Sequence, residues 1–244
     1  MSHSVHPYSH RLGYIRDWKS RWFGVRGKYQ ANLKSDIILR EHLAKTLRDF
    51  YVSGVEIERN EKQLRIIVKT ARPGMFIGKN GEGLTKLKSD LTKLLGRLKL
   101  SAPKEVKVDV EEVRSPESNA AILARMVAES LEKRLPFRRV MKQILDKAMA
   151  NRDVLGVKVY CGGRLGGADM ARSEELKRGR IPLQTLRADV DFARDKAHMT
   201  YGDLGIKIWV YRGDIFTKKA RARSDFHTIT LSHQHHDVSQ KSEI

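Results

Sequence analysis

The residues of this sequence whose types and spacing point to chemistry form one short glycine-rich stretch, Gly78-Lys79-Asn80-Gly81. Glycine has no Cβ, so two glycines separated by two residues let backbone amides approach a polyanion closely, and the lysine between them adds positive charge at the same place. A strand-like pattern precedes the stretch and a helical pattern follows it. We therefore interpret these four residues as a nucleic-acid clamp.

A large excess of positive charge supports a polyanionic partner. The 244 residues include 48 Lys and Arg against 29 Asp and Glu, a formal net charge of +19 with a pI near 10.1. Nucleic acid is the leading candidate. A second cationic group belongs to a predicted helix over residues 137–150, where Arg139 and Lys142 fall opposite the apolar face and Arg138 lies at its flank. With this net charge, phosphate contact is favoured over a merely solvated helix face.

Nucleotide-binding motifs of other kinds do not match. A nucleotide-hydrolase phosphate loop ends in Gly-Lys-Ser or Gly-Lys-Thr, whereas Asn80 follows Lys79 here. The run Gly162-Gly163-Arg164-Leu165-Gly166-Gly167 follows a predicted strand, but its spacing differs from the dinucleotide fingerprint. We interpret this run as chance, turn geometry or close backbone packing.

Enzymatic and metal chemistry also lack support. Cys161, the only cysteine, alternates with apolar residues and is interpreted as a core thiol; a single cysteine forms no intrachain disulfide and fits a reducing cytosol. His233, His235 and His236 are interpreted as part of a solvated tail, because nothing rigid is predicted to hold them as metal ligands. No catalytic constellation is predicted on a scaffold, so we expect neither an enzyme nor a metal or cofactor.

The elements that position the glycine stretch make up a first domain over residues 35–114. A helix is expected to start with Ser35 or Asp36 as its N-cap, followed by two antiparallel strands, the glycine stretch, a Leu-rich helix and a third strand around Val108. This order meets the demands of a KH domain, whose loop clamps single-stranded RNA. Residues 1–34 show no persistent period and are predicted to be a basic arm, either a solvated tail or a segment that orders on RNA.

A second domain is predicted over residues 115–213, beginning at Ser115-Pro116. Its patterns indicate helices over about 118–135 and 137–150, strands around Val159 and Ile208, and weaker strand signals between them. Residues 214–244 are predicted to be a disordered basic and His-rich tail. The predicted fold class is therefore α+β, with two small domains and flexible basic termini.

Several separated motifs, in order, resemble the S-three family, the third protein of the bacterial-type small ribosomal subunit. The stretches that carry the resemblance are Arg11-Leu12-Gly13, Trp18 with Trp22-Phe23, Ala71-Arg72-Pro73-Gly74, Ile77-Gly78-Lys79-Asn80-Gly81, Phe137-Arg138-Arg139, Gly163-Arg164-Leu165-Gly166-Gly167-Ala168, Gly179-Arg180-Ile181-Pro182-Leu183, Thr185-Leu186-Arg187-Ala188-Asp189 and Thr200-Tyr201-Gly202. The resemblance implies a type II KH domain followed by an α/β domain in which two helices cover a small sheet. Asn80 and Gln143 stand where the family often has a basic residue, and the tail is His-rich.

The resemblance also implies a function. It places the protein in the cytoplasm, in the head of the small ribosomal subunit, bound to 16S-type rRNA and beside the tenth and fourteenth small-subunit proteins. The basic face of Arg138, Arg139 and Lys142 is implied to line the path of incoming mRNA, near the fourth and fifth small-subunit proteins. Further candidates for rRNA contact are Arg11, Arg16, Lys19, Arg72, Arg164, Arg178 and Arg180.

Two other classes of function stay open at this point. A free KH-type regulator outside the ribosome is the main alternative, and a nuclease or lyase acting on nucleic acid is the weaker one. We expect no membrane association, because the sequence has no apolar run long enough to span a bilayer and no secretory signal pattern. No homo-oligomer is expected.

Overall fold

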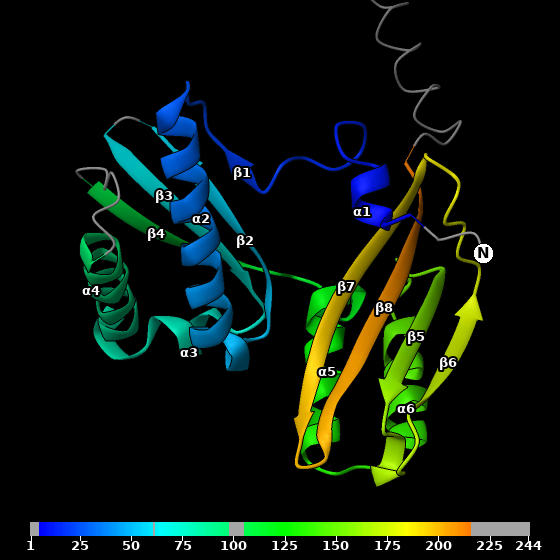
Figure 1. Cartoon of the computed structure of the whole chain (residues 1–244). Helices are drawn as coiled ribbons and strands as arrows, with labels where there is room; N and C mark the ends of the chain where they lie inside the picture. Colours follow the sequence, from blue (N-terminus) through cyan, green and yellow to red (C-terminus); the bar gives the residue numbers. More distant parts are fainter. Residues whose placement is uncertain (1–4, 61, 98–104, 216–244) are drawn as a thin grey trace, which may run out of the picture.

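A computed structural model of the chain describes residues 5–60, 62–97 and 105–215. Within this part the chain forms an N-terminal and a C-terminal unit, each with a four-stranded sheet whose helices lie on one face (Figure 1). The predicted α+β class is confirmed. The predicted tail beyond residue 215, including its histidines, lies outside the described residues.

The N-terminal unit is built by alternating apolar residues that face two Leu-rich helices. Its elements are β1 (Ser20–Arg21), α2 (Gly27–Thr46), η1 (Arg48–Phe50), β2 (Val52–Arg59), β3 (Gln63–Thr70), α3 (Pro73–Ile77), η2 (Lys79–Gly81), α4 (Glu82–Arg97) and β4 (Glu105–Glu112). The sheet order is β1-β2-β3-β4, with β2 and β3 antiparallel and β3 and β4 parallel. Leu43 of α2, Ile66 of β3 and Leu91 of α4 are fully buried in its core. The expected three-stranded sheet therefore gains a short fourth strand, β1.

The start of α2 corrects the sequence prediction. Neither Ser35 nor Asp36 is an N-cap, because α2 begins at Gly27 and both residues are buried within it. The Asp36 carboxylate lies 2.9 Å from the buried Arg59 guanidinium and accepts a hydrogen bond of 2.7 Å from Trp22 Nε1. Aspartate is common at helix starts, but Asp36 is instead the ion-pair partner of the buried Arg59. The local sequence pattern does not reveal this pairing.

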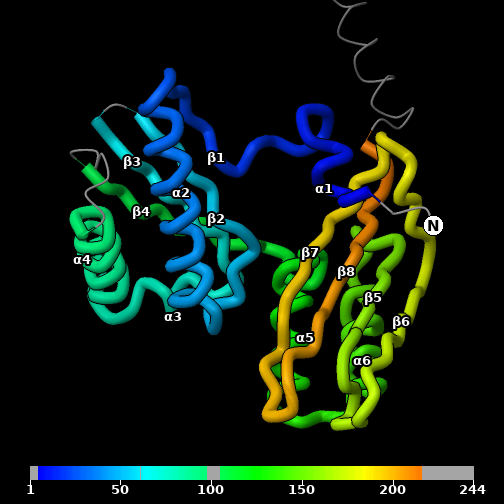
Figure 2. Tube along the Cα trace, viewed as in Figure 1, coloured from blue at the N-terminus to red at the C-terminus, as the bar shows by residue number. Residues whose placement is uncertain are grey.

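The N-terminal arm is ordered on both units, contrary to the expectation of a solvated or RNA-ordered tail. A short helix, α1 (Pro7–His10), lies against the C-terminal sheet, and β1 pairs in parallel with β2 of the N-terminal sheet. Figure 2 shows this segment crossing from one unit to the other. The arm therefore ties the two units together within the chain itself.

The C-terminal unit follows the predicted boundary at Ser115-Pro116. Its elements are η3 (Pro116–Ser118), α5 (Ala120–Glu132), α6 (Phe137–Met149), β5 (Gly156–Gly163), η4 (Leu165–Gly167), β6 (Arg172–Gly179), β7 (Ala188–Met199) and β8 (Gly202–Asp214). The sheet is antiparallel with the order β6-β5-β8-β7. Both helices cover one face, and the other face looks toward the viewer in Figure 1. The weak strand signals between the predicted strands correspond to β6 and β7.

Polar contacts join the two units near α5. Asn119 Nδ2 donates to Ser53 Oγ at 2.6 Å, and the Tyr51 hydroxyl donates to the Glu129 carboxylate. Arg48 pairs with Glu132 across the same junction. No helix among the described residues combines the length and the apolar character needed to cross a membrane.

Candidate RNA-binding surfaces

The glycine loop lies in an exposed turn between α3 and α4. Gly78 and Gly81 have φ angles of 72° and 78°, in the left-handed region that glycine adopts without strain. Asn80 has a φ of 53°, which asparagine tolerates better than most residues and which accounts for an asparagine at this place. Lys79 and Asn80 are both exposed. The predicted clamp residues are thus together, with the lysine free to meet a phosphate.

A third glycine, Gly83, holds the loop close to its support and was missed at the sequence level. A Cβ at Gly83 would lie 2.4 Å from the Phe76 carbonyl oxygen and 3.0 Å from that of Ile77. The first turn of α4 therefore packs directly on the backbone of α3. The sequence does show a glycine two positions after Gly81. Helix propensity alone, however, counts a glycine in a helix only as a loss of helix stability and does not indicate close packing.

The basic face of α6 is brought together as predicted, but its members are not equivalent. Arg138 donates to both carboxylate oxygens of Glu174, at 3.1 and 3.0 Å, although its side chain is 69% exposed. The hydrogen bond from Arg138 lowers the pKa of Glu174. Arg139 and Lys142 are exposed and form no ion pair with a described carboxylate. They are the cations of this face that have no described carboxylate partner.

An acidic residue on α6 itself is kept away from these cations. Asp146 lies four residues after Lys142, a spacing at which opposite charges pair along a helix. In the structure Asp146 instead accepts a hydrogen bond from Arg178 of β6. Arg178, predicted as an rRNA contact, is therefore engaged in an ion pair, and this pair leaves Lys142 unpaired.

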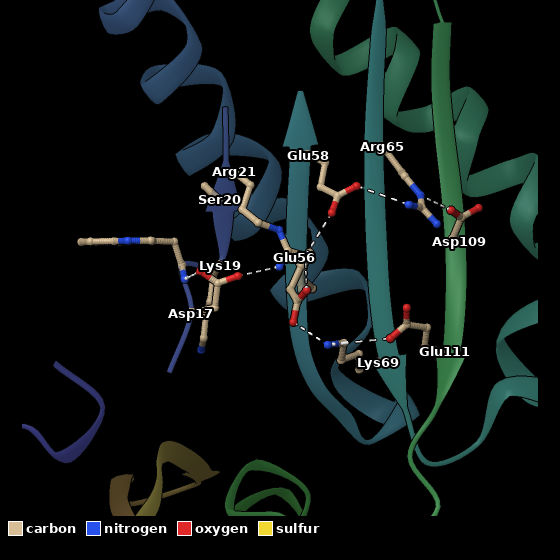
Figure 3. A network of polar contacts seen from close by, with 12 residues as sticks. Asp17, Lys19, Ser20, Arg21, Glu56, Glu58, Arg65, Lys69, Asp109 and Glu111 are labelled. Atoms are coloured by element: carbon tan, nitrogen blue, oxygen red, sulfur yellow. Dashed lines mark hydrogen bonds and ion pairs between the residues drawn. The ribbon is translucent and has the colours of Figure 1, made fainter. Parts of the chain in front are cut away.

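The outer face of the N-terminal sheet, opposite its helices, is covered by an ion-pair ladder (Figure 3). Arg65 pairs with Glu58 and Asp109, and Lys69 pairs with Glu56 and Glu111. Arg65 and Lys69 therefore already have carboxylate partners on neighbouring strands, and Lys107 pairs with Glu105 of its own strand. A polyanion would have to displace those carboxylates, so this face is the least suited of the described surfaces to RNA.

Two arm residues proposed as rRNA contacts have structural roles in the chain. The Arg11 side chain is fully buried and donates to the carbonyl oxygens of Pro7, Pro182, Leu183, Thr185 and Ala188. It has no surface left for a phosphate, which contradicts its prediction as an rRNA contact. Arg16 is half-buried and donates to Asp189 at 2.6 Å. Both side chains fasten the arm to the C-terminal unit.

The remaining candidates are scattered over the surface rather than gathered at one site. Arg72 is exposed and stacks on the Tyr51 ring, 4.5 Å from its centroid. Arg164 donates to the carbonyl oxygens of Ala168 and Tyr201 and so braces its own loop. Lys19 and Arg180 are exposed.

The structure also shows the surroundings of Cys161 and of the metal-ligating residue types. Cys161 is buried in the core of the C-terminal unit, and burial raises the pKa of its thiol to about 12. Among the described residues no group of three or more His, Cys, Asp or Glu side chains is arranged to hold a metal ion. Gly163 has a φ of 136°, which residues with a Cβ rarely adopt, and a Cβ there would lie 3.2 Å from the Asp203 carbonyl oxygen, so backbone geometry and close packing together explain this glycine.

Comparison with known proteins identifies both units. The KH domain family matches residues 38–118, and the family described as ribosomal protein S3, C-terminal domain, matches residues 127–210. The small ribosomal subunit protein uS3 of Caldicellulosiruptor bescii is 44% identical over 222 residues, which are 91% of this chain and 97% of the relative. The protein of the same name in Clostridium perfringens is 41% identical over 226 residues, which are 92% of this chain and 99% of the relative. The one in Xanthomonas oryzae pv. oryzae is 44% identical over 216 residues, which are 88% of this chain and 85% of the relative.

The chain belongs to the ribosomal protein S3 family. It is therefore a structural protein of the small ribosomal subunit in the cytoplasm, and not an enzyme. The recognition made from separated motifs is confirmed. Within this S3-family chain, the residues that sequence reasoning missed are the acidic partners Glu174 and Asp146 and the packing glycine Gly83.

Proposed function

We propose that this S3-family chain binds 16S-type rRNA in the head of the small subunit and lines the path by which mRNA enters. The observation that carries the mRNA role is the pair Arg139 and Lys142, which are exposed and free of described carboxylate partners. Their helix is held in place by Val140, Met141 and Ala148, which are buried against the C-terminal sheet. Two fixed cations about one helical turn apart suit the successive phosphates of a single strand.

The rRNA contacts belong, in this proposal, to the exposed cations of loops. Lys79 in the glycine loop after α3 and Arg72 at the start of α3 are both exposed. Arg180 adds a cation on the C-terminal unit. The expected neighbours remain the tenth and fourteenth small-subunit proteins in the head and the fourth and fifth at the mRNA path.

The experiment compares two double variants with the same change in charge. Small subunits carrying Arg139→Ala with Lys142→Ala are expected to translate a message with a stable downstream hairpin more slowly than wild type, with little change on an unstructured message. Subunits carrying Lys147→Ala with Arg152→Ala lose one lysine from the last turn of the same helix and one arginine from the turn that follows it, and they are expected to resemble wild type. Equal behaviour of the two double variants would remove the proposed mRNA role.

A free KH-type regulator is the second candidate function, and a separate measurement addresses it. Sedimentation of a cell extract through high salt is expected to show this chain in fixed ratio to small subunits. A large pool at the top of the gradient, bound to other RNA, would favour the regulator.

A further inference from the structure

A groove separates α2 of the N-terminal unit from the face of the C-terminal sheet that lies opposite α5 and α6. Its volume is about 1210 Å³, larger than the roughly 300–1,000 Å³ of typical small-molecule pockets. The wall on the α2 side includes Lys45 and Arg48, and the floor comes from strands β5, β7 and β8 and the start of β6. We call this feature the interdomain groove.

The strand register sets the floor of the interdomain groove. Tyr160 of β5 lies opposite Lys207 of β8, which lies opposite Arg194 of β7. The adjacent residues Cys161 and Ile206 are buried in the core on the helix side. Because side chains alternate along a strand, Tyr160, Lys207 and Arg194 project together from the open face.

At the centre of this floor, the Tyr160 ring packs against the backbone of a glycine. A Cβ at Gly162 would lie 3.1 Å from the Tyr160 ring, so the ring rests over that glycine. The next residue across the sheet is Gly205, which also carries no side chain. The Lys207 Nζ lies 5.2 Å from the centroid of the Tyr160 ring. The floor thus offers a half-buried ring, an adjacent cation and a flat area without side chains.

The charges of the interdomain groove are mostly positive and partly unpaired. Its lining includes two acidic side chains, Glu41 and Asp195, and six cationic ones, which are Lys45, Arg48, Arg172, Arg194, Lys196 and Lys207. Arg48 is held by Glu132, and Asp195 faces Arg125 of α5 at 3.8 Å. Lys45, Arg194 and Lys207 form no ion pair with a described carboxylate. Lys45 on the wall and Arg194 and Lys207 on the floor are therefore cations without a described carboxylate partner.

The N-terminal arm covers the neighbouring part of the same sheet face but leaves the interdomain groove open. His6 packs edge-on against Phe192, with ring centroids 4.7 Å apart, and Phe192 contacts Trp209. Phe192 and Trp209 are paired across β7 and β8 two residues away from the pair Arg194 and Lys207, so all four side chains are on the same face of the sheet. Among residues 5–60, 62–97 and 105–215, the arm therefore covers Phe192 and does not cover Tyr160.

We propose that the interdomain groove holds a single-stranded segment of rRNA, with a base stacked on Tyr160 and phosphates on Lys45, Arg194 and Lys207. This inference rests on the proposed rRNA-binding function and adds a site distinct from the glycine loop and from α6. Stacking on the half-buried ring of Tyr160 requires an unpaired base, because bases within a duplex already stack on their neighbours. An acidic protein segment would satisfy the cations but would not use the ring and the flat glycine floor beside it.

The test uses the purified full-length chain and a fluorescein-labelled oligouridine as the probe. The variant Arg194→Ala with Lys207→Ala removes a cross-strand pair of free cations from the interdomain groove. Its matched control is Arg65→Ala with Lys107→Ala, a cross-strand pair on the outer face of the N-terminal sheet. The groove variant is expected to lower the slope of log affinity against log salt by about 1.4, while the control leaves it nearly unchanged.

The aromatic part of the proposal has its own variants. Tyr160→Leu is expected to weaken binding by roughly 5- to 150-fold at the groove, whereas Tyr160→Phe keeps the ring and binding close to wild type. Circular dichroism and thermal unfolding confirm that each variant is folded. Ultraviolet cross-linking of assembled small subunits, read by peptide mass, is expected to place RNA on the peptide that contains Tyr160.

The outcomes separate this inference from the proposed function. RNA cross-links on the glycine loop or α6 but none on β5, β7 or β8 would overturn the groove proposal alone. No RNA cross-link anywhere on the chain would overturn both. Cross-linking of the groove to another protein in assembled subunits, or equal salt slopes for the groove and control variants, would also overturn the groove proposal.

Discussion

Neutralising Glu174 is expected to strengthen RNA binding by the α6 face. In the structure this carboxylate accepts two hydrogen bonds from Arg138, at 3.1 and 3.0 Å, so a phosphate must compete with it for the guanidinium. Glu174→Gln keeps the size of the side chain but removes the charge that makes such a hydrogen bond strong. The variant releases Arg138 to join Arg139 and Lys142.

The magnitude follows from counting phosphate contacts. One added contact to a single strand steepens the dependence of log affinity on log salt by about 0.7. Between about 50 and about 200 mM salt, the variant should therefore lose about 2.6-fold more affinity than wild type, starting from tighter binding at the lower salt. The assay is fluorescence anisotropy of the full-length chain with a short unstructured RNA.

Two controls test whether Arg138 is the cause. Glu111→Gln removes an acidic side chain from the ion-pair ladder of the N-terminal sheet and is expected to leave the salt slope near its wild-type value. Combining Glu174→Gln with Arg138→Ala is expected to cancel the gain. An unchanged slope in the single variant, or a gain that survives in the double variant, would refute the reasoning that Glu174 restrains Arg138.

Two further predictions concern stability. Gly83→Ala is expected to destabilise the chain by about 1–3 kcal/mol in denaturant unfolding, because its Cβ would lie 2.4 Å from the Phe76 carbonyl oxygen. The control Gly96→Ala, in the same helix, places its Cβ in open space and is expected to stabilise the chain by about 0.5–1 kcal/mol. Destabilisation of equal size by both variants would exclude close packing as the cause. Hydrogen bonds from Lys133 and then Tyr51 lower the pKa of Glu129, so the carboxylate stabilises the fold above its unfolded pKa, and this contribution is lost as the pH falls through its folded pKa. Thermal unfolding from neutral to acidic pH should show a smaller loss for Glu129→Gln than for wild type, and parallel curves would contradict the linkage.

The parts of this protein that follow local periodicity could be predicted from the sequence. The apolar stripe of α6 and the alternation in β4 and β5 are set by residues a few positions apart, because side-chain direction repeats every 3.6 residues in a helix and every two in a strand. The glycine loop was likewise found from neighbouring residues, since its φ angles are a local property. The charge excess and the ordered motifs were sufficient to recognise the S3 family.

The state of each cation, whether buried, paired or exposed, depends on contacts between residues far apart in the sequence. Arg11 meets the carbonyl of Ala188 across 177 positions of the chain, and Arg138 meets Glu174 across 36. No local pattern distinguishes a buried, fully bonded arginine from one that waits for phosphate, because both are equally cationic in the sequence. The number of positive charges was therefore a property of the sequence, whereas burial and pairing in the tertiary structure decided which of them remain free to contact RNA.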